Sequence, residues 1–172
     1  LFQEASLPFY GLGCSTIADR DYDLSTMTEL VSELGQVTAA YLFNELDVRR
    51  LALIYDTNPN STYLTQLVAL NFVLLGGEIV SSASLPESVD DTVSLLDETT
   101  SLYPDLVYFF GAAPEFVRLL TARSQSSLSD VPFGAADQSY SPELLFSTVD
   151  TTGVTLVRTL PQERTDPTAY LL

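Results

Sequence analysis

Three residue types are missing from this 172-residue chain, which contains no histidine, no lysine and no tryptophan. Without histidine, neither a Ser-His-Asp triad nor a Cys-His pair can form. Without lysine, the chain has neither a Walker-type phosphate loop nor a Schiff-base nucleophile. No G-x-G-x-x-G sequence follows an expected strand, so the dinucleotide-binding fingerprint is absent as well. Paired carboxylates are the catalytic groups that remain available, and with 23 acidic residues their pairing is inevitable and carries no signal.

Cysteine and long apolar runs are also scarce. Cys14 is the only cysteine, so the chain can form neither an internal disulfide nor a multi-cysteine metal site. The longest uncharged apolar run, at 67–75, is far shorter than the roughly 20 residues of a membrane-spanning helix. The acidic run at 19–23 begins like a calcium loop, but Leu24 replaces the required glycine and Leu30 the bidentate glutamate. We therefore expect no cofactor, no metal and no insertion of this segment into a membrane.

The charge is strongly negative, with 23 acidic residues against seven arginines and a net charge of −16. Such a field repels phosphate backbones and anionic lipids, so nucleic acid and membrane surfaces are not expected partners. The acidic residues are spread along the chain rather than gathered in blocks. This pattern indicates a solvated acidic surface rather than an acidic recognition patch.

Short apolar runs alternate regularly with amphipathic stretches, and 46% of the residues are hydrophobic. The apolar runs predict strands at 7–10, 51–55, 78–82, 106–110, 132–136 and 154–160. The amphipathic stretches predict helices at 33–46, 62–75, 91–101, 115–122 and 141–146. Alternation of this kind with short loops predicts an α/β fold, in which a doubly wound, mostly parallel sheet is flanked by helices on both faces.

The most informative segment runs from Pro104 to Arg118 and reads PDLVYFFGAAPEFVR. Its apolar run ends at Gly111 and Ala112, and a proline and a glutamate suited to the first turn of a helix follow at once. In open α/β sheets, ligands bind outside the carboxyl ends of strands, beside such helix starts. The segment therefore predicts a binding crevice at Gly111 and Ala112.

Polar residues follow two other expected strands. Cys14, Ser15 and Thr16 come after the strand at 7–10, where their hydroxyls and backbone N–H groups could hold a carboxylate. The alternative is a plain loop whose hydroxyl groups bond to their own backbone. Asp137 follows the strand at 132–136, where it could pair with a ligand ammonium or cap the next helix. The residues alone leave both alternatives open.

Seven motifs occur together in a fixed order: LPFYGLGCST, GQVTAAYLFNEL, RRLALIYD, GGEIV, PDLVYFFGAAPEFVRLL, FGAADQ and GVTLVRTLP. In this order they resemble the type I periplasmic binding protein family, particularly the branched-chain amino-acid receptors of ABC transporters. The resemblance implies two α/β lobes, joined by crossover segments, that close on a small ligand. It divides the chain into the end of a first lobe with its ligand loop (1–30), a second lobe (31–158) and a crossover back (159–172). The chain is then expected to be a fragment of a longer receptor.

The same resemblance implies roles for individual residues. Cys14 and Thr16, with Ser15 between them, would occupy the first-lobe positions that hold the α-carboxylate and ammonium of an amino acid. Asp137 would be the second-lobe acid that pairs with the ammonium.

Two positions depart from the family pattern. Asn60, followed by Ser61, stands where the amino-acid receptors place a tyrosine and a glycine. Ala112 stands where an aromatic residue commonly follows the equivalent of Gly111. Both changes enlarge the pocket, so the expected ligand is an amino acid or a related small molecule rather than a branched-chain amino acid in particular.

The resemblance implies a non-catalytic, periplasmic or extracellular lobe that holds its ligand by lobe closure. An ABC transporter permease is the partner it suggests, and a lipid anchor ahead of the chain is one option. A first alternative keeps the fold but makes the lobe a sensor or interaction module with a divergent pocket. A second alternative is a small α/β enzyme that uses carboxylates.

Overall fold

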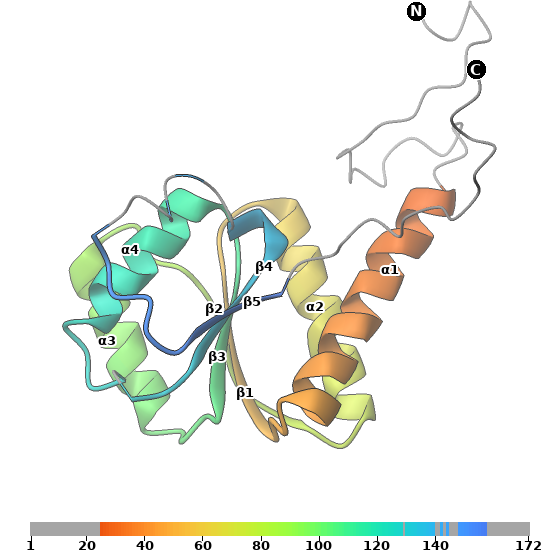
Figure 1. Ribbon diagram of the computed structural model, residues 1–172, viewed down its shortest axis with the longest axis horizontal. Coiled ribbons are helices and arrows are strands. Elements are labelled where there is room, and N and C mark those ends of the chain that lie inside the picture. The colour runs from red at the N-terminus through yellow and green to blue at the C-terminus, as the bar shows by residue number, and fades with distance from the viewer. Residues whose placement is uncertain (1–24, 129, 140–141, 143, 145–147, 158–172) are drawn as a thin grey trace, which may run out of the picture.

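A wholly parallel sheet forms the centre of the structure, with helices on both of its faces (Figure 1). This computed structural model describes residues 25–128, 130–139, 142, 144 and 148–157, and side chains from residue 31 onward. Its strand order is β2-β1-β3-β4-β5. The strands are β1 (Arg50–Tyr55), β2 (Glu78–Ser84), β3 (Leu106–Phe110), β4 (Phe133–Ala136) and β5 (Val154–Val157). The predicted α/β architecture is confirmed.

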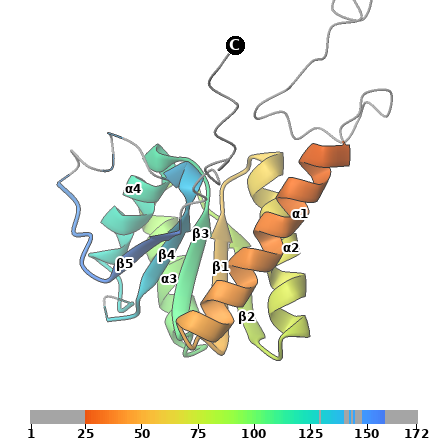
Figure 2. The same cartoon turned by 45° about the vertical axis from the view of Figure 1, so that its right-hand side comes forward.

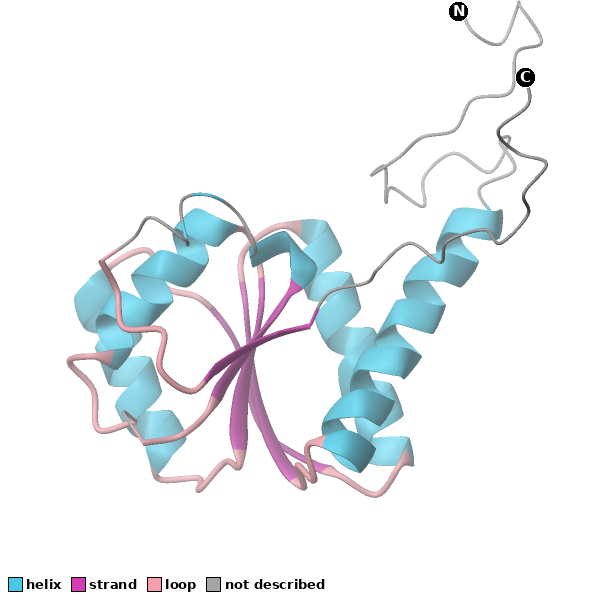
Figure 3. Ribbon diagram, in the orientation of Figure 1, coloured by secondary structure: helices cyan, strands magenta, loops and turns pink. Residues whose placement is uncertain are grey.

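Two pairs of helices enclose the sheet, as the two views in Figures 1 and 2 and the colouring in Figure 3 show. One pair, α1 (Ser25–Ala40) and α2 (Pro59–Leu74), covers one face, and the other pair, α3 (Val89–Thr100) and α4 (Ala113–Arg123), covers the opposite face. A π-helical turn, η1 (Tyr41–Glu45), follows α1, and a 3-10 turn, η2 (Asp137–Ser139), follows β4. None of the described helices is long and apolar enough to cross a membrane.

Most predicted elements occur where the sequence places them, and the differences lie at the ends of helices and strands. The helix expected at 33–46 begins at Ser25 and changes to the π-helical turn at Tyr41. The strand expected at 7–10 lies outside the described residues, as does everything after Val157. Of the helix expected at 141–146, Pro142 and Leu144 are described, and both are helical.

The central strands β1 and β3 contribute side chains to two separate cores. In β1, the side chains that face α1 and α2 are those of Leu51, Leu53 and Tyr55. The side chains of Ala52 and Ile54 face α3 and α4. In β3 the same alternation sends Leu106, Tyr108 and Phe110 to the first core and Val107 and Phe109 to the second. Successive side chains of a strand point to opposite faces, so a strand covered on both sides reads as a continuous apolar run.

Helix α2 has clear capping residues at both of its ends. Asn58 caps its start by accepting a hydrogen bond from the N–H of Asn60 at 2.9 Å. Its end is a Schellman motif, in which Gly76 has a φ of 97° and the N–H of Gly77 donates to the carbonyl of Phe72.

The apolar residues of α2 are divided between core and surface. Leu64 and Val68 are buried, whereas Leu70 and Leu74 are 59% and 75% exposed. The helix is apolar nearly all round, so the sequence pattern does not say which of its sides meets the sheet.

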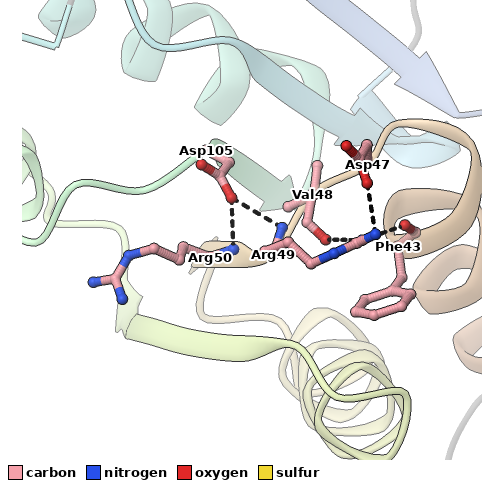
Figure 4. Close-up of polar contacts among 6 residues, drawn as sticks. All are labelled: Phe43, Asp47, Val48, Arg49, Arg50 and Asp105. Atoms are coloured by element: carbon pink, nitrogen blue, oxygen red, sulfur yellow. Dashed lines mark hydrogen bonds and ion pairs between the residues drawn. The ribbon is translucent and has the colours of Figure 1, made fainter.

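At the amino edge of the sheet, the carboxylate of Asp105 connects β1 with β3 (Figure 4). One of its oxygens accepts hydrogen bonds from the backbone N–H groups of Arg49 (2.9 Å) and Arg50 (2.8 Å). The guanidinium of Arg49 lies 4.0 Å from the centre of the Phe43 ring and donates to the carbonyl of Phe43 at 2.6 Å. These contacts tie the start of β1 to β3 and to the turn that follows α1.

We expect Asp105→Ala to lower the free energy of unfolding by about 1–2 kcal/mol, because two backbone donors lose a charged acceptor. Urea unfolding followed by circular dichroism measures the change. Asp47→Asn is the matched control, because it removes only an exposed ion pair with Arg49 and should change stability by less than about 0.5 kcal/mol. Asparagine tolerates the positive φ of Asp47, which is 55°. Equal effects of the two substitutions would contradict the role of Asp105.

Asp97 in α3 holds the turn that follows α4. Its carboxylate accepts hydrogen bonds from the backbone N–H (2.8 Å) and the hydroxyl (2.7 Å) of Ser127. These bonds, the backbone bond first, lower the pKa of Asp97 from its ordinary value. The stability they contribute is present above the pKa of Asp97 in the unfolded chain and is lost as the pH falls through its lower folded pKa.

Ser127→Ala should raise the pKa of Asp97 part of the way to its ordinary value, because the hydroxyl bond is lost and the backbone bond stays. Carbon-detected NMR titration of the Asp97 side-chain carboxyl measures its pKa in the wild type and in the variant. The variant should also lose stability at a higher pH than the wild type during acid unfolding. An unchanged pKa would refute the assigned bond.

Candidate functional site

The carboxyl ends of the parallel strands lie at one edge of the sheet (Figure 3). The chain crosses from β1 to β2 on one side and on to β3 on the other, so the order β2-β1-β3 makes the ends of β1 and β3 a topological switch point. Ligands of open α/β sheets bind in the crevice at such a point. We define the carboxyl edge as the three segments that follow β1, β3 and β4, at 56–61, 111–113 and 137–139.

Asp56, directly after β1, connects the first of these segments with the second. Its Oδ2 accepts a hydrogen bond from the N–H of Ala112 at 3.1 Å, and its Oδ1 accepts one from the N–H of Asn58 at 3.0 Å. Its own N–H donates to the carbonyl of Phe110 at 3.0 Å. The side chain of Asp56 therefore holds the segment that precedes α2 against the segment that precedes α4.

Gly111 is the residue that allows this close approach. A Cβ at this position would lie 2.4 Å from Cζ of Phe109 and 2.9 Å from Oδ2 of Asp56, both closer than real Cβ atoms come. The carbonyl of Gly111 accepts a hydrogen bond at 2.8 Å from the hydroxyl of Ser139, which is fully buried. The segment after β4 is thereby attached to the segment after β3.

A third contact joins the start of α2 to the segment after β4. The hydroxyl oxygen of Ser61, which is fully buried, lies 3.5 Å from Oε1 of Gln138. This is a long hydrogen bond, and Ser61 is also held through its carbonyl, which accepts from the hydroxyl of Thr65 at 2.7 Å. All three segments of the carboxyl edge are thus linked by side chains.

Four of the predicted site residues lie at the carboxyl edge: Asn60, Gly111, Ala112 and Asp137. Gly111 is buried, Asn60 is half-buried in the first turn of α2, and Ala112 and Asp137 are exposed. Cys14, Ser15 and Thr16 lie outside the described residues. The ligand-binding roles of all seven stay predictions.

The position of Asn60 differs from what the sequence suggested, whereas that of Ala112 agrees with it. Asn60 belongs to α2 rather than to a loop, because Asn58 caps the helix and Pro59 begins it. Ala112 is the N-cap residue of α4 and provides no side-chain cap.

Sequence reasoning missed Asp56, Ser61, Ser139 and Tyr108. Asp56 had a usable signal, because it is a polar residue immediately after a buried strand. The serines had none, since serine is frequent in this chain and their partners are far away in sequence.

Tyr108 is a fully buried side chain in the middle of β3. Its hydroxyl has no hydrogen-bond partner among the described residues. Burial raises the pKa of Tyr108 from its ordinary value, and the charge of Asp137 and the neighbouring Tyr41 add to this effect. The phenol is therefore neutral at physiological pH.

The electrostatic character of this end of the sheet is negative. In the part of the chain that the structure describes, the loops and first helical turns after β1 to β4 contain acidic residues and no basic ones: Asp56, Glu87, Asp90, Asp91, Glu115 and Asp137. Within the same part, no group of three or more metal-ligating side chains is arranged to hold a metal ion. The arrangement can present carboxylates and amide or hydroxyl groups to a small polar molecule.

Gly111→Ala should destabilise the protein by about 1–3 kcal/mol, because the added methyl group overlaps the Phe109 ring and the Asp56 carboxylate. Urea unfolding measures the loss. Ala112→Ser at the next, exposed position is the control. It should leave stability unchanged or raise it by about 0.5–1 kcal/mol, since serine can cap α4. A Gly111→Ala variant as stable as the wild type would show that the tight contact is not required.

Comparison with models of protein families and with curated proteins found no match. Solved structures do match. A putative branched-chain amino acid ABC transporter protein from Rhodospirillum rubrum is 22% identical, with a TM-score of 0.65 over 80% of this chain and 39% of that chain. A leucine-binding protein from Thermotoga maritima is 24% identical, with a TM-score of 0.58 over 66% of this chain and 32% of that one.

A third similar structure is a solute-binding protein of an ABC transporter from Rhodopseudomonas palustris HaA2 in complex with p-hydroxybenzoic acid. It is 16% identical, with a TM-score of 0.54 over 63% of this chain and 30% of that chain. The chain thus spans between about three and four tenths of the length of these structures. The described part of the chain has the α/β fold of the matched part of these type I periplasmic binding proteins.

Proposed function

We propose that this chain is the second lobe of an extracytoplasmic solute receptor that serves an ABC transporter and binds its ligand without catalysis. The observation that carries the proposal is the carboxyl edge. Asn60, Gly111, Ala112 and Asp137 gather there, at the switch point of the β2-β1-β3 order, and three side-chain links hold the segments together. Segments that are held in place before binding lose little conformational freedom when a ligand binds.

The ligand we propose is an amino acid or a related small polar molecule. The resemblance to amino-acid receptors and the exposed carboxylate of Asp137 support it, because a carboxylate can form a charge-assisted hydrogen bond with an ammonium group. The small side chain of Ala112 enlarges the proposed pocket relative to the aromatic residue that is common at this position in the family. Similar solved structures include both a leucine-binding protein and one with an aromatic acid bound, which is consistent with this breadth.

Binding by lobe closure requires contacts from the first lobe as well. The proposed first-lobe contacts are Cys14, Ser15 and Thr16, and the proposed partner in transport is a permease in the membrane. A periplasmic or extracellular location follows from this role. Closure would then be driven by contacts that the ligand makes with both lobes only in the closed state.

Thermal unfolding with a panel of amino acids, amides and small aromatic and aliphatic acids tests the proposal on a polypeptide that contains both lobes. A ligand at 100 times its dissociation constant should stabilise the folded state by about 2.7 kcal/mol. This chain alone should respond weakly. No stabilisation by any member of the panel would contradict the transport function and favour an interaction module on the same fold.

Asp137→Ala should weaken binding of an amino-acid ligand roughly 10- to 100-fold, because a charge-assisted hydrogen bond to the ammonium is lost. Isothermal titration calorimetry measures the affinity. Glu98→Gln, which removes an exposed charge on α3, is the control and should leave affinity unchanged. Undiminished binding by the Asp137→Ala variant would refute its assigned role.

A further inference from the structure

The carboxylate of Asp56 accepts hydrogen bonds from backbone N–H groups at the starts of two helices. Its two carboxylate oxygens accept from the N–H of Asn58, the N-cap residue of α2, and from the N–H of Ala112, the N-cap residue of α4. Backbone N–H groups at helix starts are the donors that commonly hold carboxylate and phosphate groups in α/β proteins. At the switch point of this sheet, a side chain of the chain itself uses them.

The neighbouring backbone holds the carboxylate of Asp56 between the starts of α2 and α4. The residue next to Ala112 is Gly111, and a Cβ on it would come within 2.9 Å of Oδ2 of Asp56. The N–H of Asp56 donates to the carbonyl of Phe110 at 3.0 Å, which fixes the backbone of the acid against β3. The side chain is therefore held at both its backbone and its carboxylate.

We infer that Asp56 is a positioning residue whose carboxylate acts as an internal anion, holding the starts of α2 and α4 together and filling the anion position of the carboxyl edge. This inference rests on the proposed solute-binding function for its consequence: the ligand group that meets this part of the edge is neutral or cationic. In the part of the chain that the structure describes, the loops and first helical turns after β1 to β4 contain acidic side chains and no basic ones, with Glu115 in the first turn of α4 and Asp137 after β4 among them. A second anion at this place would meet occupied donors and like charges.

The test is chemical rescue of Asp56→Ala in the full 172-residue chain, with formate as the probe and no solute present. Thermal unfolding is followed by circular dichroism in sodium formate and in sodium chloride at equal ionic strength. In chloride the variant should melt about 2–6 °C below the wild type, because two backbone donors lose their acceptor. Formate, a carboxylate small enough for the vacated space, should restore roughly half of this loss or more, while the wild type should melt at the same temperature in both salts.

Two further variants separate this role from a simple loss of packing or charge. Asp56→Asn keeps the space filled and one oxygen acceptor in place, so it should be less destabilised and insensitive to formate. Glu87→Ala removes an exposed acid after β2 and should show neither loss nor formate dependence.

Each outcome decides the inference. An Asp56→Ala variant as stable as the wild type would overturn the connection between α2 and α4. A destabilised variant without a specific response to formate would overturn the anion position. If the variant does not fold in chloride, folding in formate supports the inference, and failure in both salts overturns it. Because the measurement needs no solute, rescue without any solute binding would contradict the proposed function and leave the role of Asp56 standing.

Discussion

Burial of β1 and β3 on both faces is the constraint on which the other elements depend. Each strand sends alternate side chains into two cores, so neither face can be left open to water. Each pair of helices therefore covers one face, and α2, α3 and α4 each follow a strand and return the chain to the opposite edge of the sheet. The connecting segments are in this way confined to the two edges, where polar groups can gather without entering a core.

At each edge of the sheet, an aspartate carboxylate accepts hydrogen bonds from backbone N–H groups. At the amino edge Asp105 accepts from the backbone N–H groups of Arg49 and Arg50, at the start of β1, and at the carboxyl edge Asp56 accepts from those of Asn58 and Ala112. Both carboxylates connect the segments of β1 and β3, one before the strands and one after them. The amino edge also contains Arg49 and Arg50, which form ion pairs with Asp47 and Glu78, whereas the described loops at the carboxyl edge contain acids alone. The two edges therefore differ in charge.

The sequence alone predicted the type and order of the described elements well, and it placed Gly111 and Asp137 directly after strands. Strand runs such as 106–110 stand out because they are apolar and end at breakers, and Gly111 and Asp137 stand out as the residues that follow them. Local periodicity could not say that Leu70 and Leu74 face water, because α2 is apolar on nearly all sides. It also gave no sign that α1 begins at Ser25, where the apolar spacing is weak.

The sequence by itself determined the class of the fold and excluded much chemistry, because residue spacing and missing residue types act locally and need no knowledge of contacts. The absence of histidine and lysine is one example, and the alternation of strands with helices is another. Only the tertiary structure decided the strand order, the link from Asp56 to Ala112, and the burial of Ser61 and Ser139. The physical reason is that these contacts join residues distant in the chain. Such contacts depend on how the strands are arranged in the sheet, which the local pattern does not encode.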